Sequence, residues 1–188
     1  MDSSRIQINE MQDFIQEGLK EILGCAVLNE IAARVQTSET RTGLPAFKNI
    51  LTTQFGELVT RGILIRAGRA GFYYWMRKSG EFLGWKGADF RLLPTRSKVK
   101  RAMSDLFNFM NTEMLINAEI HELPKTWHVL VAGLTETNSV LECNFFSGMV
   151  QELLSWAGGG KYFGSRETYC QSVRGVCCEF ELDKIPLD

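Results

Sequence analysis

The segment LINAEIHELPKTWHVLVAGL, residues 115–134, decides the fold of this chain. Apolar and polar residues alternate on both sides of Pro124-Lys125, which is the pattern of strands that bury one face. A proline-containing pair between two such runs is typical of a turn. We therefore predict an antiparallel hairpin with strands at residues 115–123 and 126–134, in which His121 and His128 face each other.

A second hairpin is predicted near the C-terminal end, with strands at residues 162–169 and 176–182 and a turn containing Gly175. Between the two hairpins, residues 139–156 have helical spacing, with Ser139 as the cap and Gly158-Gly159-Gly160 as the end. The strand–helix–strand alternation of a doubly wound parallel sheet does not run through the chain. We expect an antiparallel sheet of about four strands instead.

The half of the chain before these hairpins is predicted to be mostly helical. Gly24 is expected to end or bend the first helix, Gly84–Pro94 to be a break, and Ser97 to cap the helix that follows. The fold class is therefore α/β, of the α+β kind, with helices packed on one side of the sheet. Apolar residues recur at helical spacing in residues 8–23, 26–35, 45–55, 57–83 and 97–111.

The predicted helix 57–83 contains four glycines, Gly62, Gly68, Gly71 and Gly80. A glycine inside a helix destabilises it by about 1 kcal/mol relative to alanine, so their accumulation needs a reason. We expect another helix or a ligand to approach the backbone closely there.

Size and charge exclude several classes of function. The chain has 188 residues with a net charge of −1, which gives no general attraction to nucleic acid. No apolar run approaches the length of a membrane span, and the polar start of the chain is unlike a secretion signal, so we expect a cytoplasmic protein. Residues 1–40 are expected to form a helical extension of a ligand-binding domain at 41–188, together one compact unit.

Four of the five cysteines follow residue 142, and this clustering suggests metal ligation. Cys143 is expected in the first turn of a helix, and Cys170 and Cys178 on either side of the last hairpin. With Glu167 they would supply three thiolates and one carboxylate to a closed, structural zinc site. The alternative is that the cysteines are buried small apolar residues. Cys177 is expected to point to the opposite face from Cys178.

The segment from Cys143 to Leu182 resembles the 4-vinyl reductase domain family. The resemblance is carried by the motifs CNFFSG at 143–148, ETYC at 167–170 and GVCCEF at 175–180. It implies a fold related to subunits of the TRAPP vesicle-tethering complex and to haem-based nitric-oxide sensors, and a homodimer. It also implies zinc held by Cys143, Glu167, Cys170 and Cys178, as in the family's phenol-sensing, hydrocarbon-binding regulators.

The same resemblance implies a flat hydrophobic ligand, either a tetrapyrrole or an aromatic hydrocarbon, and a link to pigment metabolism, photosynthesis or photosystem assembly. Large aromatic side chains would suit such a ligand if some of them line a pocket. The alternative is a packed core without a ligand. The residues expected to bind the ligand are Phe72, Trp75, Phe107 and Trp127.

Catalysis is not expected, although an enzyme stays open as an alternative. A reductase acting on a tetrapyrrole vinyl group would need a hydride donor, and the sequence has no nicotinamide or flavin motif. A scaffold or assembly factor without a small ligand is a third hypothesis, with a protein partner docked on the helical surface. The basic residues Arg96, Lys98, Lys100 and Arg101 indicate a solvated helix face or a site for an anionic partner.

Overall fold

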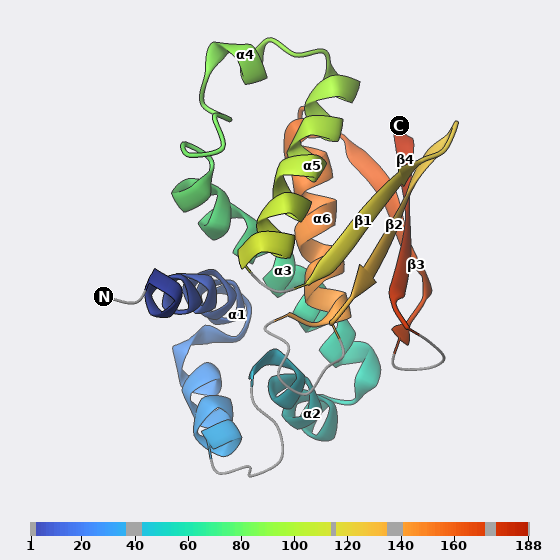
Figure 1. Ribbon diagram of the computed structural model, residues 1–188. Coiled ribbons are helices and arrows are strands. Elements are labelled where there is room, and N and C mark those ends of the chain that lie inside the picture. Colours follow the sequence, from blue (N-terminus) through green and yellow to red (C-terminus); the bar gives the residue numbers. More distant parts are fainter. Residues whose placement is uncertain (1–2, 37–42, 114–115, 135–140, 172–175, 188) are drawn as a thin grey trace.

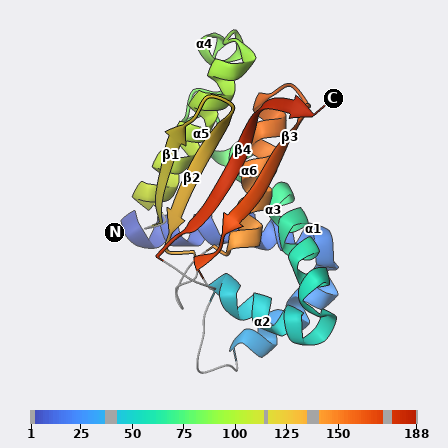
Figure 2. The same cartoon turned by 90° about the vertical axis from the view of Figure 1, so that its right-hand side faces the viewer.

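The computed structural model describes residues 3–36, 43–113, 116–134, 141–171 and 176–187. A four-stranded antiparallel sheet in the order β1-β2-β4-β3 is covered on one face by α5 and α6, as Figures 1 and 2 show. The predicted fold class is confirmed. The helices are α1 Ser3–Gln36, α2 Gly43–Phe55, α3 Glu57–Ser79, α4 Ala88–Arg91, α5 Thr95–Glu113 and α6 Cys143–Ala157, and the strands are β1 Asn117–Glu122, β2 Thr126–Ala132, β3 Tyr162–Tyr169 and β4 Cys178–Leu187.

The first hairpin has the predicted turn and register. Leu123 N–H donates to the Thr126 carbonyl over 2.9 Å, and His121 lies opposite His128. Buried and half-buried residues alternate along β2, so Trp127 and its inward neighbours face the helices. The sheet therefore has one apolar face under α5 and α6 and one polar face that carries both histidines.

The glycines of α3 mark the places where helices cross. A Cβ on Gly68 would overlap the carbonyl oxygen of Phe145 in α6, and a Cβ on Gly18 of α1 would overlap the carbonyl oxygen of Ala67. Gly148 of α6 meets the backbone of Ile65 in the same way. The expected close approach is confirmed, and another helix makes it. Gly62 has no neighbouring atom within 4 Å of its Cβ position, so it takes no part in the crossing.

Several helix boundaries in the structure differ from the predicted ones. Gly24 has a φ of 77° and bends α1, as expected. The predicted break at Gly84–Pro94 contains the short helix α4. This helix was not predicted, because a single turn leaves no periodic pattern to detect. Helix α5 begins at Thr95, so Ser97 is not its cap.

The boundaries of the C-terminal half differ in a similar way. The cap of α6 is Glu142, whereas Ser139 and the turn residue Gly175 lie outside the described residues. The helix ends at Gly158, as expected, and β4 runs on to Leu187. The longer β4 pairs with both β2 and β3, which makes it a central strand.

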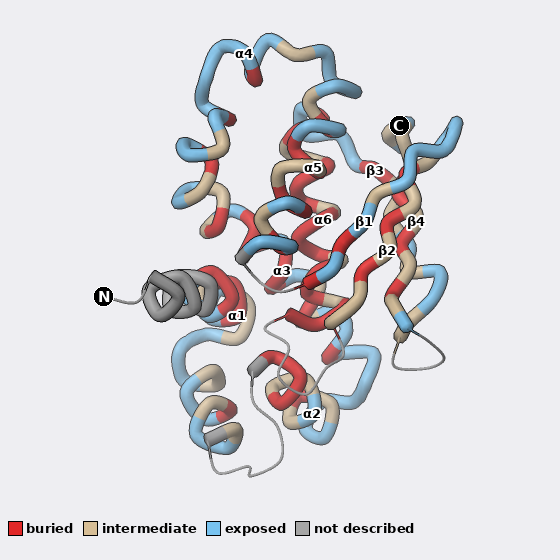
Figure 3. Tube along the Cα trace, in the orientation of Figure 1, coloured by how far each residue is buried: buried red, intermediate tan, exposed pale blue. Residues whose placement is uncertain are grey.

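The first helix shares the core of the rest of the chain. Phe14 and Leu19 of α1 are buried against α3, and Figure 3 shows buried residues running through α1, α3 and α6 into the sheet. The domain boundary at residue 40 stays a prediction. None of the described helices is long and apolar enough to cross a membrane.

Candidate functional site

Three cysteines and one glutamate meet where α6 begins beside the second hairpin. Ligand atoms of Cys143, Glu167, Cys170 and Cys178 all lie within 4.8 Å of one another. The structure thus brings together all four residues predicted to bind a metal, and we call them the Cys–Glu cluster. They come from the start of α6, from β3, from the residue after β3 and from the start of β4.

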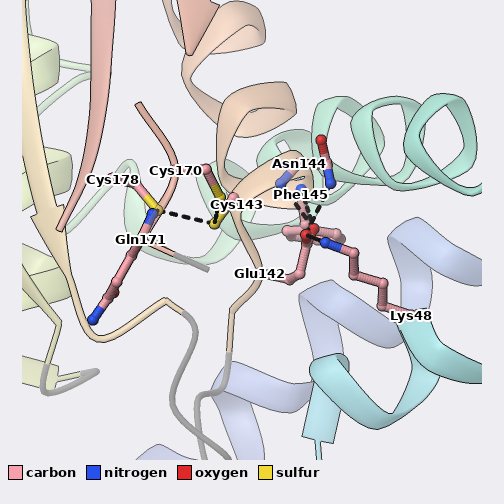
Figure 4. Close-up of polar contacts among 8 residues, drawn as sticks. All are labelled: Lys48, Glu142, Cys143, Asn144, Phe145, Cys170, Gln171 and Cys178. Carbon is pink, nitrogen blue, oxygen red and sulfur yellow. Dashed lines mark hydrogen bonds and ion pairs between the residues drawn. The ribbon is translucent and has the colours of Figure 1, made fainter. Parts of the chain in front are cut away.

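The start of α6 is held in place by Glu142, as Figure 4 shows. Its carboxylate accepts hydrogen bonds from the backbone N–H groups of Asn144, at 2.8 Å, and Phe145, at 3.3 Å. Lys48 of α2 donates to the same carboxylate over 2.6 Å. A buried carboxylate with a cation and N-terminal N–H groups as partners is well stabilised. These contacts fix the position of Cys143, the next residue.

The sulfurs of the cluster are in hydrogen-bonding contact. The Sγ of Cys143 lies 3.1 Å from that of Cys178 and 3.9 Å from that of Cys170. Its hydrogen bond to Cys178, together with burial, raises the pKa of the Cys143 thiol, whereas the same hydrogen bond lowers the pKa of Cys178. Cys178 is therefore the thiol of the pair that ionises more readily.

Glu167 completes the cluster with an oxygen that has no other role. Its Oε1 is buried and has no hydrogen-bond partner among the described residues. A buried carboxylate oxygen without a partner is costly unless a proton or a cation reaches it. The cluster can thus hold a thiolate-preferring cation, or remain a set of buried thiols beside an acid. Cys177 is half-buried and is not among the four.

A second feature is a hollow of about 640 Å³ near the opposite end of α6. Its aromatic wall is formed by Trp85, Phe90 and Trp156. We call the hollow, together with this wall, the aromatic hollow. The lining comes from the end of α3, from α4 and the segment before it, from α5 and from the end of α6, in the upper part of Figure 1. The remaining lining residues are Met76, Arg77, Gly80, Lys86, Arg91 and Lys98.

The three rings of the aromatic hollow are stacked on one another. The ring centroid of Trp156 lies 4.9 Å from that of Trp85 and 5.6 Å from that of Phe90, with interplanar angles of 31° and 16°. The indole N–H of Trp85 donates to Asp105 over 2.8 Å, which fixes the orientation of that ring. The three rings therefore form a rigid packed cluster at the edge of the hollow, in which Trp85 and Phe90 are almost fully buried and Trp156 is partly exposed.

The residues predicted to bind a ligand lie elsewhere. Phe72 and Trp75 are buried behind the wall, with the Phe72 ring 6.0 Å from that of Trp156. Phe107 stacks on Phe146 beneath the sheet, and Trp127 lies on β2. Phe72 and Trp75 are thus brought together, while Phe107 and Trp127 lie apart from them. None of the four lines the aromatic hollow, and their role in binding stays a prediction.

The two histidines lie on the polar face of the sheet. The Nε2 of His121 is 3.6 Å from a carboxylate oxygen of Glu119, and that of His128 is 3.4 Å from Glu179. No described serine or cysteine is hydrogen-bonded to either imidazole as a nucleophile would be. Both imidazoles thus lie beside carboxylates on the outer face of the sheet.

Comparison with known proteins identifies the fold of this chain. No protein-family model matches the sequence, and no curated protein matches it. Among solved structures, the Tt H-NOX domain with two substitutions is 12% identical, with coverage of 100% of this chain and 97% of that one and a TM-score of 0.59. An S. oneidensis H-NOX protein in the Fe(II) ligation state is 9% identical, with 95% and 94% covered and a TM-score of 0.58.

A third solved structure, an oxygen-binding H-NOX domain related to soluble guanylate cyclases, is 12% identical, with 93% of each chain covered and a TM-score of 0.55. The chain therefore has the H-NOX fold over nearly its whole length. Sequence identities this low support a shared fold but do not support a shared chemistry.

These matches correct the family assignment. The resemblance to the 4-vinyl reductase domain family is wrong, because the similar solved structures are H-NOX domains. The link to photosynthesis depended on that family and is corrected with it. The structural zinc, which both the cysteine spacing and the resemblance suggested, is corrected as well. Three of the similar solved structures are described with Fe(II) or haem, and the descriptions of these three do not name zinc. The tetrapyrrole vinyl reductase is likewise unsupported.

The residues of this chain do not fit haem in the aromatic hollow. Haem iron is held by histidine, cysteine thiolate, tyrosine or methionine paired with histidine. Both histidines of the chain lie on the outer face of the sheet, and none of the residues that line the hollow is a histidine, cysteine or tyrosine. Met76 lines it without a histidine beside it.

Proposed function

We propose that this chain, which has the fold of H-NOX domains, is a small-molecule-binding module that holds a flat hydrophobic ligand in the aromatic hollow. The observation that carries the proposal is the stacked wall of Trp85, Phe90 and Trp156 along a hollow of about 640 Å³. A volume of several hundred cubic ångströms that combines apolar side chains with polar groups is typical of ligand sites.

A flat ligand suits this wall better than a globular one. Aromatic rings attract other π-systems in offset stacks, and the partly exposed ring of Trp156, held by its stacking on Phe90, is the ring that a flat ligand would meet. The indole of Trp85 is anchored by Asp105, so the surface exists before the ligand arrives. A preformed surface loses little side-chain freedom on binding.

The test uses 1-pyrenemethanol, a flat and uncharged probe, with energy transfer from tryptophan to pyrene as the readout. Replacing Trp156 by leucine removes one side of the stack and is expected to weaken binding about tenfold. Phe55→Leu serves as the matched control, because Phe55 is 38% exposed and lies outside the hollow. Absence of binding to the unaltered protein, or equal affinity for both variants, would contradict the proposal.

A second proposal concerns the Cys–Glu cluster, which we propose to be the ligand set of a metal ion. The proposal concerns only those four residues and does not identify the metal. Three sulfurs and one carboxylate within 4.8 Å of one another support it, as does the partnerless oxygen of Glu167. Thiolates prefer soft and borderline cations, and binding would release the protons of the thiols that become ligands.

Cobalt(II) is a suitable probe for this cluster, because thiolate ligation gives intense sulfur-to-metal absorption bands. We expect these bands on titration of the reduced protein and their loss in Cys170→Ser. Cys177→Ser is the control, since Cys177 is next to Cys178 in the sequence but outside the cluster, and it should keep the bands. Identical spectra from the two variants would mean that the cluster is a set of buried thiols.

The predicted homodimer and protein partner stay predictions. A scaffold without a small ligand, the alternative function, is favoured if no flat probe binds.

A further inference from the structure

We infer that the ligand of the aromatic hollow is a planar aromatic acid, that is, a flat ring system with at least one carboxylate or similar anionic group. The inference rests on the proposed function and specifies the class of ligand. It follows from four cationic side chains placed around one aromatic wall.

The cations come from different parts of the fold. Arg77 is in the last turn of α3, Lys86 lies before α4, Arg91 ends α4, and Lys98 is in α5. All four line the aromatic hollow, and none of the residues that line it with them carries a negative charge. Four elements thus contribute positive charge to one apolar site.

Three of the four cations have no carboxylate partner among the residues that the structure describes. Lys86 has a carboxylate partner, Glu81, at 2.9 Å. Arg77 lies over the ring of Tyr74, with its guanidinium carbon 5.6 Å from the ring centroid. Within the part of the chain that the structure describes, neither Arg77, Arg91 nor Lys98 forms an ion pair. An anion in the hollow would be their first charged partner.

The neighbouring cations of α5 show the contrast. Arg96 and Lys100, on either side of Lys98 in the sequence, bind Glu122 of β1 at 2.9 and 2.7 Å. Hydrogen bonds from Lys100, Lys184 and Arg96 lower the pKa of Glu122 to about 2. The basic run identified in the sequence is therefore divided. Arg96 and Lys100 hold α5 to the sheet. Arg101 pairs with Asp105 one turn along α5, and Lys98 lies at the hollow.

The positive charge of the hollow is a local property. The net charge of the chain is −1, so the cations around the hollow do not reflect a generally basic protein. Arginine and lysine at the edge of an apolar site give orientation and specificity to an acidic ligand. Because the hollow lacks an axial ligand for iron, the acid groups and the stacked rings must supply the binding energy.

The experiment compares two probes with the same ring, 1-pyrenemethanol and pyrene-1-carboxylate, by energy transfer from tryptophan. We expect the carboxylate to bind about tenfold more tightly at low salt, because several partly exposed ion pairs each contribute a few-fold. The difference should shrink as salt is added. It should also shrink in the double variant Arg91→Gln/Lys98→Gln, with the affinity for the alcohol unchanged.

A control with the same loss of charge is Arg61→Gln/Lys125→Gln, at two exposed positions away from the hollow. It should keep the preference for the carboxylate. Equal affinities for the two probes, or a preference that the control variant also loses, would overturn the inference and leave the proposed function standing. Failure of both probes to bind would overturn the proposed function itself.

Discussion

At the scale of single residues, the contact that joins α3 to α6 is a buried acid. Glu152 of α6 is 6% exposed and accepts a hydrogen bond from the Tyr73 hydroxyl at 2.6 Å and one from Arg69 Nε at 2.7 Å. Both partners come from α3, one turn apart. The carboxylate is therefore satisfied on both oxygens, as a buried charge requires.

This contact makes Tyr73 titrate abnormally. The hydrogen bond to Glu152, with burial and the negative charge as further causes, raises the pKa of Tyr73 from 10.0 to about 12. A raised pKa means that the folded protein holds the phenol proton more tightly than the unfolded chain does. The stabilisation is complete below pH 10 and is lost as the pH rises toward 12.

We predict that Glu152→Gln lowers the pKa of Tyr73 toward its ordinary value, because the carboxylate no longer opposes a phenolate. The ¹³C shift of the Tyr73 ring carbon, followed through alkaline pH, measures it. Glu21→Gln is the matched control, since Glu21 is hydrogen-bonded to Tyr74 and should change only that tyrosine. An unchanged Tyr73 titration in Glu152→Gln would show that the contact is not formed in solution.

Residue-level reasoning from sequence found the Cys–Glu cluster but not the aromatic hollow. Cys143, Cys170 and Cys178 lie at the ends of elements, so closing one hairpin beside one helix was enough to bring them together. Trp85 and Phe90, by contrast, lie in a stretch that has no periodic pattern, and they meet Trp156 only through packing across the fold. Aromatic residues of the core and of a lining look the same in a sequence.

At the scale of elements, the crossing of α3 and α6 depends on the absence of side chains. Gly68 and Gly148 each lie against a carbonyl oxygen of the other helix. A backbone cannot move aside as a flexible side chain can, so a methyl group there would separate the helices.

Gly68→Ala is therefore predicted to destabilise the protein by about 2 kcal/mol or more, through overpacking at the crossing. Gly62→Ala, six residues earlier in α3, is the matched control, because no atom lies within 4 Å of its Cβ position. That change should stabilise the protein by up to about 1 kcal/mol, since alanine is the better helix former. Urea denaturation measures the free energy of unfolding of both variants. Similar values for the two variants would contradict the close crossing of α3 and α6.

Element prediction succeeded where a pattern repeats and failed where it does not. The alternation around Pro124-Lys125 gave the first hairpin and its register, and the spacing of apolar residues gave α1 and α5. Helix α4 was missed because four residues hold barely one turn. The cap of α6 was misplaced because Glu142, an uncommon cap, takes its position from Lys48 of a distant helix.

At the scale of the whole molecule, the resemblance misled because it rested on local motifs. The three motifs cover the Cys–Glu cluster and little else, whereas the H-NOX fold extends over more than nine-tenths of the chain, with 93% covered in the shortest of the matches quoted. The order of helices and strands defines the fold, whereas the motifs describe only the region around the Cys–Glu cluster.

The chain has the fold of H-NOX domains, but no histidine lines its aromatic hollow. Three of the similar solved structures are described with haem or Fe(II), yet the histidines of this chain lie on the outer face of the sheet. What it offers instead is a stacked aromatic wall with cations beside it. The proposed ligand follows from those residues and not from the fold.

The most direct test is the ¹H–¹⁵N spectrum of the four tryptophan indoles, recorded while pyrene-1-carboxylate is added. Trp85 and Trp156 line the hollow, whereas Trp127 lies on β2. We predict that the indole signals of Trp85 and Trp156 shift in a saturable way and that the signal of Trp127 stays in place. A shift confined to Trp127, or no shift in any of the four signals, would contradict the claim that this hollow binds a ligand.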